Sequence, residues 1–140
     1  MIKKHLILLV ILGLFINACT PDENTNNQYQ GTYIGNVDFY MNGIYGNTTS
    51  KTINLTTAST AGSFLMINSI FLSNTCNISG NNLDIPASTV GSASGIEIVE
   101  HGTGTFSGNT LTIEFYQDQV NSTTNAVVAS GKWTGTLIKQ

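Results

Sequence analysis

The sequence predicts an all-β fold in which an antiparallel meander of about eight strands closes into a small barrel or a strongly coiled sandwich. Three observations predict this fold: polar and apolar residues alternate along several segments, one turn motif occurs twice, and glycines occupy inward positions of the later strands. Alternation with a period of two is typical of half-buried strands, and inward glycines let a sheet coil sharply. Residues 29–140 are enough for one domain with a single core.

The first predicted strand covers residues 32–41. Tyr33, Val37 and Phe39 share one face of it, and polar residues occupy most of the opposite face. Asn42-Gly43 follows directly, and this dipeptide is the strongest short signal for a hairpin turn. The chain is therefore expected to reverse after residue 41.

A second strand is predicted over residues 51–57, where Ile53 and Leu55 alternate with polar residues. The apolar run over residues 64–72 is compatible with one short helix or with two strands around Asn68-Ser69. Its short length and the neighbouring strand signals favour two strands.

Two similar segments predict two further hairpins. Each has an apolar residue, then Ser-Gly-Asn, then an alternating strand, and they lie at residues 78–85 and 106–113. A two-residue Gly-Asn loop suits a tight turn with positive backbone angles, and such a turn fixes the register. This register pairs Ile78 with Leu83 and Phe106 with Leu111.

Extending the second register places glycines opposite large residues on the inner face. Gly104 then opposes Ile113, and Gly102 opposes Phe115. The last predicted strand, residues 127–139, places Gly131 and Gly135 on either side of an inward Trp133, with Leu137 following. Glycine opposite a bulky residue favours a sheet that curls towards closure.

Residues 1–18 are predicted to be an export signal peptide, including a signal helix. Two lysines precede an apolar core, which is shorter than the ~20 residues that span a bilayer. Ile16, Ala18 and Cys19 resemble the lipobox of bacterial lipoproteins, which implies lipidation of Cys19 and a polar tether over residues 19–28. The alternative for Cys19 is a disulfide with Cys76. Without that disulfide, Cys76 is expected to be a small buried hydrophobic residue.

The acidic pair Asp22-Glu23 follows the cysteine closely. It resembles the signal that sends some lipoproteins of Bacteroidetes-type bacteria to the outer face of the outer membrane, although a solvated linker explains it equally well. We therefore expect a lipid anchor in the outer membrane of the cell envelope, with surface exposure as one outcome.

Charge excludes one class of partner. After residue 18 the chain has three lysines, no arginine and eight carboxylates, and the whole chain has a net charge of -3. Nucleic-acid binding requires a basic patch that replaces counterions on phosphates. We therefore expect no nucleic-acid partner.

Several motifs together resemble a known group of proteins. The motifs are Gly31-Thr32-Tyr33, Leu83-Asp84-Ile85-Pro86, the segment 102–113 and Gly135-Thr136-Leu137-Ile138-Lys139. With them the chain is similar to the small uncharacterised outer-membrane lipoproteins of Bacteroidetes, whose domain is lipocalin-like. The resemblance implies a barrel that binds a small apolar ligand inside. The inward aromatic residues Tyr33, Phe39, Phe115 and Trp133 are then the expected ligand-binding residues.

His101 is the only histidine after the signal peptide. The hairpin register places it opposite Tyr116 on the outer face, with Glu114 diagonal to it and Glu97 on its own strand. This grouping suits a general base or a metal ligand, but an exposed polar pair explains it as well. One imidazole without a second imidazole or a thiolate is a poor transition-metal site. We therefore expect no catalytic residue, no metal and no cofactor.

Tyr40 and Tyr45 flank the first predicted turn. Exposed aromatic side chains can stack on sugar rings, although such residues also cap a core. The preferred function is a lipid-anchored, non-enzymatic envelope protein with a small apolar ligand inside its barrel. The alternative is a surface module with a packed core that binds a glycan or a protein through its loops.

Overall fold

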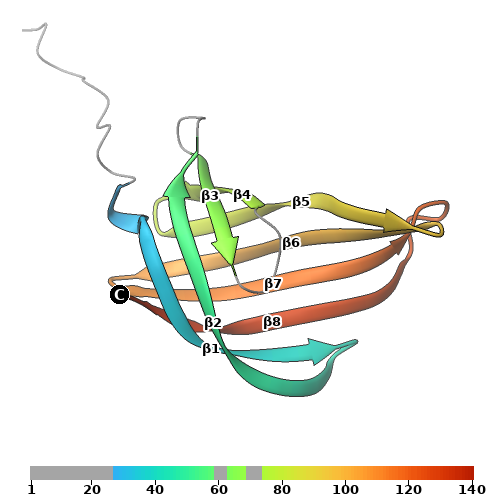
Figure 1. Ribbon diagram of the computed structural model, residues 1–140, viewed down its shortest axis with the longest axis horizontal. Coiled ribbons are helices and arrows are strands. Elements are labelled where there is room, and N and C mark those ends of the chain that lie inside the picture. The colour runs from blue at the N-terminus through green and yellow to red at the C-terminus, as the bar shows by residue number, and fades with distance from the viewer. Residues whose placement is uncertain (1–26, 59–62, 69–73) are drawn as a thin grey trace, which may run out of the picture.

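The computed structural model describes residues 27–58, 63–68 and 74–140. They form one antiparallel meander that closes into a barrel, because β1 pairs with both β2 and β8 (Figure 1). The elements are η1 (Asn27–Tyr29), β1 (Gly31–Met41), β2 (Ile44–Thr57), β3 (Ser63–Asn68), β4 (Asn74–Ser79), β5 (Asn82–Ala93), β6 (Ile96–Ser107), β7 (Thr110–Asn121) and β8 (Val127–Lys139). The predicted all-β fold is confirmed, and it is a barrel instead of a sandwich.

The N-terminal predictions lie outside the described residues. They are the signal helix, Cys19 and most of the tether. Within the described ranges, no helix has the length and apolar character needed to cross a bilayer.

The predicted turns determine the register of three hairpins. Asn42 and Gly43 have φ values of 48° and 81° between β1 and β2, and Gly80 and Gly108 each have a φ of 57°. The pairs Ile78 with Leu83 and Phe106 with Leu111 form as predicted. Positive φ costs glycine no steric energy, and asparagine tolerates it better than most residues. These positions therefore allow the chain to reverse within two residues.

Two predicted segments have different bounds in the structure. β2 begins at Ile44, earlier than the predicted residue 51, because the polar residues before Lys51 pair with the second half of β1. Residues 63–68 form a strand, which confirms the strand alternative for that part of the apolar run. Residues 69–72 lie outside the described ranges.

Strand lengths divide the barrel into two halves. β3 and β4 have 6 residues each, whereas β1, β2 and β5–β8 have 11 to 14. The long strands therefore extend beyond β3 and β4 at the end where the β1–β2, β5–β6 and β7–β8 connections lie (Figure 1). We call this part the extended half and the other part the closed half.

The core fills the closed half. Its buried hydrophobic residues are Tyr29, Tyr33, Val37, Ile53, Leu55, Phe64, Met66, Cys76, Leu83, Ile85, Phe106, Leu111, Ile113, Phe115 and Leu137. Tyr29 of η1 caps it, because its ring packs 4.4 Å from that of Phe106 and its hydroxyl donates to the carbonyl of Gly80 at 2.8 Å. The segment before β1 thus seals this end of the barrel.

Inward glycines let β1 and β8 approach closely where the barrel closes. A Cβ on Gly135 would clash with the carbonyl oxygen of Asn36 and lie 2.8 Å from the Cα of Val37. A Cβ on Gly35 would clash in the same way with the backbone of β8. The expected role of glycine in sheet closure is confirmed at Gly135, and Gly35 on the partner strand has the same role.

Candidate functional site

One straight row of side chains crosses the outer wall of the extended half. It consists of directly opposed residues on five strands, from β6 through β7, β8 and β1 to β2: His101, Tyr116, Lys132, Tyr40 and Tyr45. Residues that are directly opposite in a sheet are close enough for their side chains to interact. We call these five residues the cross-strand row.

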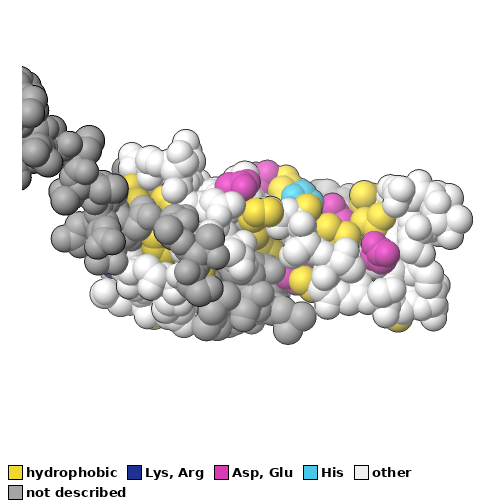
Figure 2. Space-filling view, turned by 90° about the horizontal axis from the view of Figure 1, so that it is seen from above, with side chains coloured by type: hydrophobic (Ala, Val, Ile, Leu, Met, Phe, Trp, Pro, Cys, Tyr) yellow, Lys and Arg dark blue, Asp and Glu magenta, His cyan; other side chains and the backbone are white. Residues whose placement is uncertain are grey.

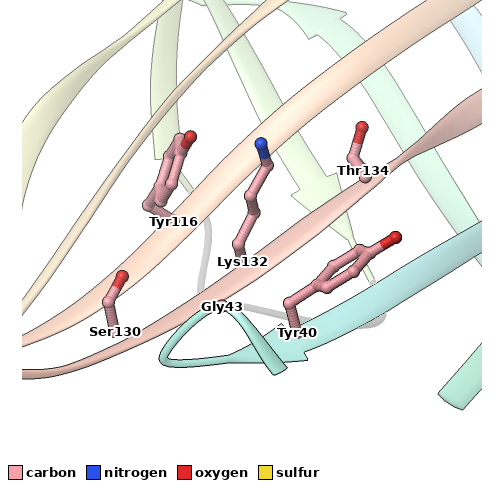
Figure 3. Close-up of a pocket in the computed structure, with 6 residues that line it drawn as sticks. All are labelled: Tyr40, Gly43, Tyr116, Ser130, Lys132 and Thr134. Carbon is pink, nitrogen blue, oxygen red and sulfur yellow. The ribbon is translucent and has the colours of Figure 1, made fainter. Parts of the chain in front are cut away.

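A hollow of about 380 Å³ lies over β8 in the middle of this row. Tyr116 of β7 and Tyr40 of β1 lie on its two sides, and Lys132 rises between them (Figure 3). The remaining lining residues are Gly43, Ser130 and Thr134. The hollow thus combines aromatic rings, hydroxyls and an ammonium group, and its volume is within the range of small-molecule sites.

The charges beside this hollow are paired. Lys132 Nζ lies 2.7 Å from Glu114 Oε2, and the hydroxyl of Tyr116 donates to Glu114 Oε1. The hydrogen bond from Lys132, followed by that from Tyr116, lowers the pKa of Glu114. The hydrogen bond to Glu114 is also the main cause of the raised pKa values of Lys132 and Tyr116. At neutral pH the group is therefore an ion pair with a neutral phenol.

Tyr116 is held from both sides. The ring of His101 stacks on it at a centroid distance of 5.0 Å and an interplanar angle of 9°, and Lys132 Nζ lies 5.5 Å from its centroid. Cation–π contact of this kind contributes about 0.5–1 kcal/mol at an exposed site. Tyr116 thus forms a ridge with its edge and hydroxyl towards the hollow, whereas the ring of Tyr40 meets that of Tyr45 edge-on.

His101 is oriented by the carboxylate of Asp118 on β7. Its Nε2 lies 3.0 Å from Asp118 Oδ2, and the side chain of Asp118 is mostly buried. The opposition of His101 and Tyr116 is as predicted, but Glu114 bonds to Lys132 and Tyr116 instead of forming a cluster with His101. An Asp–His pair orients an imidazole, and here it also holds the ring against Tyr116.

Tyr45 closes the row on β2. Its ring meets Tyr40 edge-on at 5.7 Å, and its hydroxyl lies 2.9 Å from Thr48 Oγ1. Thr48 donates in turn to Asp38 on β1. Tyr45 is more than half exposed, so the hairpin presents an aromatic surface next to the hollow.

All four predicted interior residues lie on the inner wall of the barrel, but they differ in burial. Tyr33 and Phe115 are each 1 % exposed and belong to the packed core of the closed half. Phe39 and Trp133 are half-buried, with ring centroids 4.6 Å apart, and Trp133 lies directly opposite Phe115 and packs against the core. Phe39, Trp133 and Phe115 therefore form one continuous row on the inner wall across β1, β8 and β7, whereas Tyr33 lies near the start of β1 in the packed core.

The inner wall also carries a buried carboxylate. Glu100 is 1 % exposed, and Gln117 Nε2 donates to its Oε1 at 3.0 Å. Gln117 opposes Gly131 on β8, and a Cβ on Gly131 would come within 2.9 Å of the Trp133 ring. Glycine at 131 therefore leaves the room that the indole occupies.

Charged residues are few, at 9 % of the chain. In Figure 2, acidic side chains and a histidine lie among uncharged polar and apolar groups on the face seen from above. Within the described ranges, no group of three or more His, Cys, Asp or Glu side chains is arranged to hold a metal ion.

The sequence singled out three members of the cross-strand row, His101, Tyr40 and Tyr45, and placed Tyr116 beside His101. It missed Lys132, because only the pairing of β7 with β8 brings this residue between Tyr116 and Tyr40. Asp118 could have been found by extending the second hairpin register, which places it on the outer face diagonal to His101. No family model, curated protein or solved structure matches this chain.

Proposed function

We propose that the protein is a lipid-anchored, non-enzymatic module of the cell envelope that binds a glycan on the outer wall of its barrel. The observation that carries this proposal is the hollow over β8, with Tyr40 and Tyr116 at its sides and Lys132 between them. The lipid anchor is the expectation for Cys19.

The chemistry of the hollow favours a sugar over a peptide. A pyranose ring has an apolar C–H face and a rim of hydroxyls. The ring of Tyr40 suits the apolar face, and the Ser130 and Thr134 hydroxyls with the Lys132 ammonium, which is paired with Glu114 beside the hollow, suit the rim. Among the residues that the structure describes, no Ala, Val, Leu, Ile or Met side chain of the kind that contacts an apolar peptide lines the hollow.

The Glu114–Lys132 pair supplies both kinds of hydrogen-bonding group. A carboxylate accepts from a sugar hydroxyl, and an ammonium donates to one. Charge-assisted hydrogen bonds are stronger than neutral ones, and this pair is already fixed in position by Tyr116. A ligand therefore meets groups that lose little freedom on binding.

Affinity electrophoresis of the full chain tests the proposal. Gels would contain xylan, mannan, mixed-linkage β-glucan or starch, and we expect at least one polysaccharide to retard the protein. Tyr40→Ala should weaken this binding about tenfold, because it removes the stacking surface. Ile138→Ala is the control, since Ile138 is a large exposed apolar residue on the last strand that lies outside the hollow. Migration unaffected by all four polysaccharides, or equal retardation of Tyr40→Ala and wild type, would contradict the proposal.

Membrane attachment is tested separately. In a bacterial host we expect the wild-type protein in the membrane fraction and Cys19→Ala in the soluble fraction, because acyl chains on Cys19 supply the anchor. If the variant stays in the membrane fraction, Cys19 is not the anchor.

A second candidate is the binding of a small apolar ligand inside the barrel. The observation that favours it is the half-buried pair of Phe39 and Trp133 on the inner wall of the extended half. Trp133 is the only tryptophan of the chain, so its emission reports on this location alone. Titration with palmitate should shift the emission if the ligand binds there, and unchanged emission at saturating palmitate would exclude a fatty acid from this location.

A further inference from the structure

A second hollow lies beside the first on the outer wall, and Tyr116 lines both. The second hollow has a volume of about 500 Å³ and lies over β6, towards β5. His101, Thr103 and Glu114 contribute to its lining from β6 and β7, and Pro86 does so from β5. The ridge formed by Tyr116 therefore separates two adjacent depressions.

β-Bulges define both ends of this surface. The β5–β6 register shifts between Ile85 and Ser88, so that Pro86 and Ala87 on β5 lie opposite His101 on β6. The β1–β2 register shifts between Phe39 and Tyr40, at the other end of the row. Bulges re-aim side chains and disrupt regular pairing, and they are over-represented next to functional sites. Here one bulge lies beside each hollow.

We infer that the bound glycan is a neutral, extended chain that crosses the strands and occupies both hollows. This inference rests on the proposed function. The distance along the row from His101 to Tyr40 is three strand spacings, or ~14 Å, which is longer than one pyranose ring. The edge and hydroxyl of Tyr116 then support the chain where it passes from one hollow to the other.

The charges around the hollows favour a ligand without carboxylates. Lys132 is neutralised by Glu114, and the second hollow includes the carboxylates of Asp84 and Glu114. The whole chain also has a net charge of -3. An acidic sugar would therefore meet like charge in the second hollow and an ammonium that is already paired in the first, which disfavours its binding.

The test uses oligosaccharides of one to six units from the polysaccharide that retards the full chain, titrated by calorimetry. We expect affinity to rise about tenfold from the disaccharide to the pentasaccharide and then to level off. Thr103→Glu places a longer, charged side chain in the second hollow and should remove this gain while leaving disaccharide affinity within about twofold of wild type. Thr105→Glu is the matched control, because Thr105 is exposed on the same strand but lines neither hollow, and it should change neither affinity.

The possible results separate the two proposals. If no polysaccharide retards the protein, both the glycan function and this inference are wrong. If the wild type binds the disaccharide as tightly as the pentasaccharide, or if Thr103→Glu weakens both equally, glycan binding stands and the two-hollow site is wrong. Tighter binding of a pentasaccharide that ends in a uronic acid than of the neutral chain would overturn the preference for a neutral ligand.

Discussion

The Lys132 ammonium lies 2.7 Å from one carboxylate oxygen of Glu114, and the hydroxyl of Tyr116 donates to the other oxygen of the same carboxylate. Lys132 is on β8, and the other two residues are on β7. The contact therefore links two strands on the outer wall and fixes the polar groups between the two hollows. A glycan that crosses Tyr116 would meet this ion pair.

Replacing Lys132 by methionine should raise the pKa of Glu114 towards the ordinary value of about 4.3. The hydrogen bond from Lys132 is the largest cause of the lowered pKa, and methionine removes that bond while retaining much of the side-chain volume. NMR titration of the Glu114 carboxyl carbon measures the change. An unchanged pKa would contradict the role of Lys132.

The same pair predicts how stability depends on pH. Because the folded state lowers the pKa of Glu114, its contribution is present above the unfolded value and is lost as pH falls through the folded value. Lys132 has a raised pKa, so its contribution is present below ~10.4 and is lost as pH rises through the folded value. The stability difference between wild type and Lys132→Met should therefore be constant from about pH 6 to pH 9 and shrink below about pH 4.

The size of that difference is small. Exposed ion pairs contribute about 1 kcal/mol or less, and both side chains are at least one-third exposed. Urea unfolding at pH 3 and pH 7 measures it. The same difference at both pH values would show that the pair does not contribute through ionisation of Glu114.

Gly135→Ala should destabilise the barrel by about 1–3 kcal/mol. The added Cβ would clash with the carbonyl oxygen of Asn36 and approach the Cα of Val37, so β1 and β8 would have to separate. Gly91→Ala is the matched control, because its Cβ would meet only the Ile98 side chain at an ordinary 3.8 Å. Denaturant unfolding of both variants checks this, and equal stability of the two would contradict the tight closure.

Cys76 should resist alkylation in the folded protein. It is fully buried, and burial, followed by the charge of Asp84, raises the pKa of its thiol to about 12. At pH 8 the thiolate fraction is then about one in ten thousand, and the thiolate is the reactive form. Iodoacetamide labelling, assigned by peptide mass spectrometry, should modify the Cys76 peptide at least ~1,000-fold more slowly without urea than with it. Labelling at similar rates would mean that Cys76 is accessible.

Local turn chemistry explains why much of the fold was predictable. Gly80-Asn81 and Gly108-Asn109 each fix a two-residue turn, and the alternation that follows then fixes which residues face inward. The pairs of Gly104 with Ile113 and Gly102 with Phe115 follow from this register alone. The inward position predicted for Trp133 is also correct, and the structure adds its contact with Phe39.

The candidate site was less predictable, because long-range pairing assembles it. The connection between β7 and β8 is longer than two residues, and the register shifts between Gln119 and Val120, so no turn motif fixes Lys132 opposite Tyr116. The neighbouring position of Tyr40 depends on the pairing of the first strand with the last. Residues 46–50 of β2 are glycine and polar residues on both faces, and this lack of alternation hid the first half of the strand.

The most direct test of the glycan site is a ¹H–¹⁵N spectrum of the full chain during titration with a pentasaccharide. This pentasaccharide comes from the polysaccharide that retards the protein in affinity electrophoresis. We predict shifts of the backbone amides of Tyr40, Tyr116 and Lys132, with little change in the indole Nε1–H signal of Trp133 and the side-chain amide of Gln117. Those two signals report on the inner wall. Shifts confined to Trp133 and Gln117 would contradict the outer-wall site and place the ligand inside the barrel.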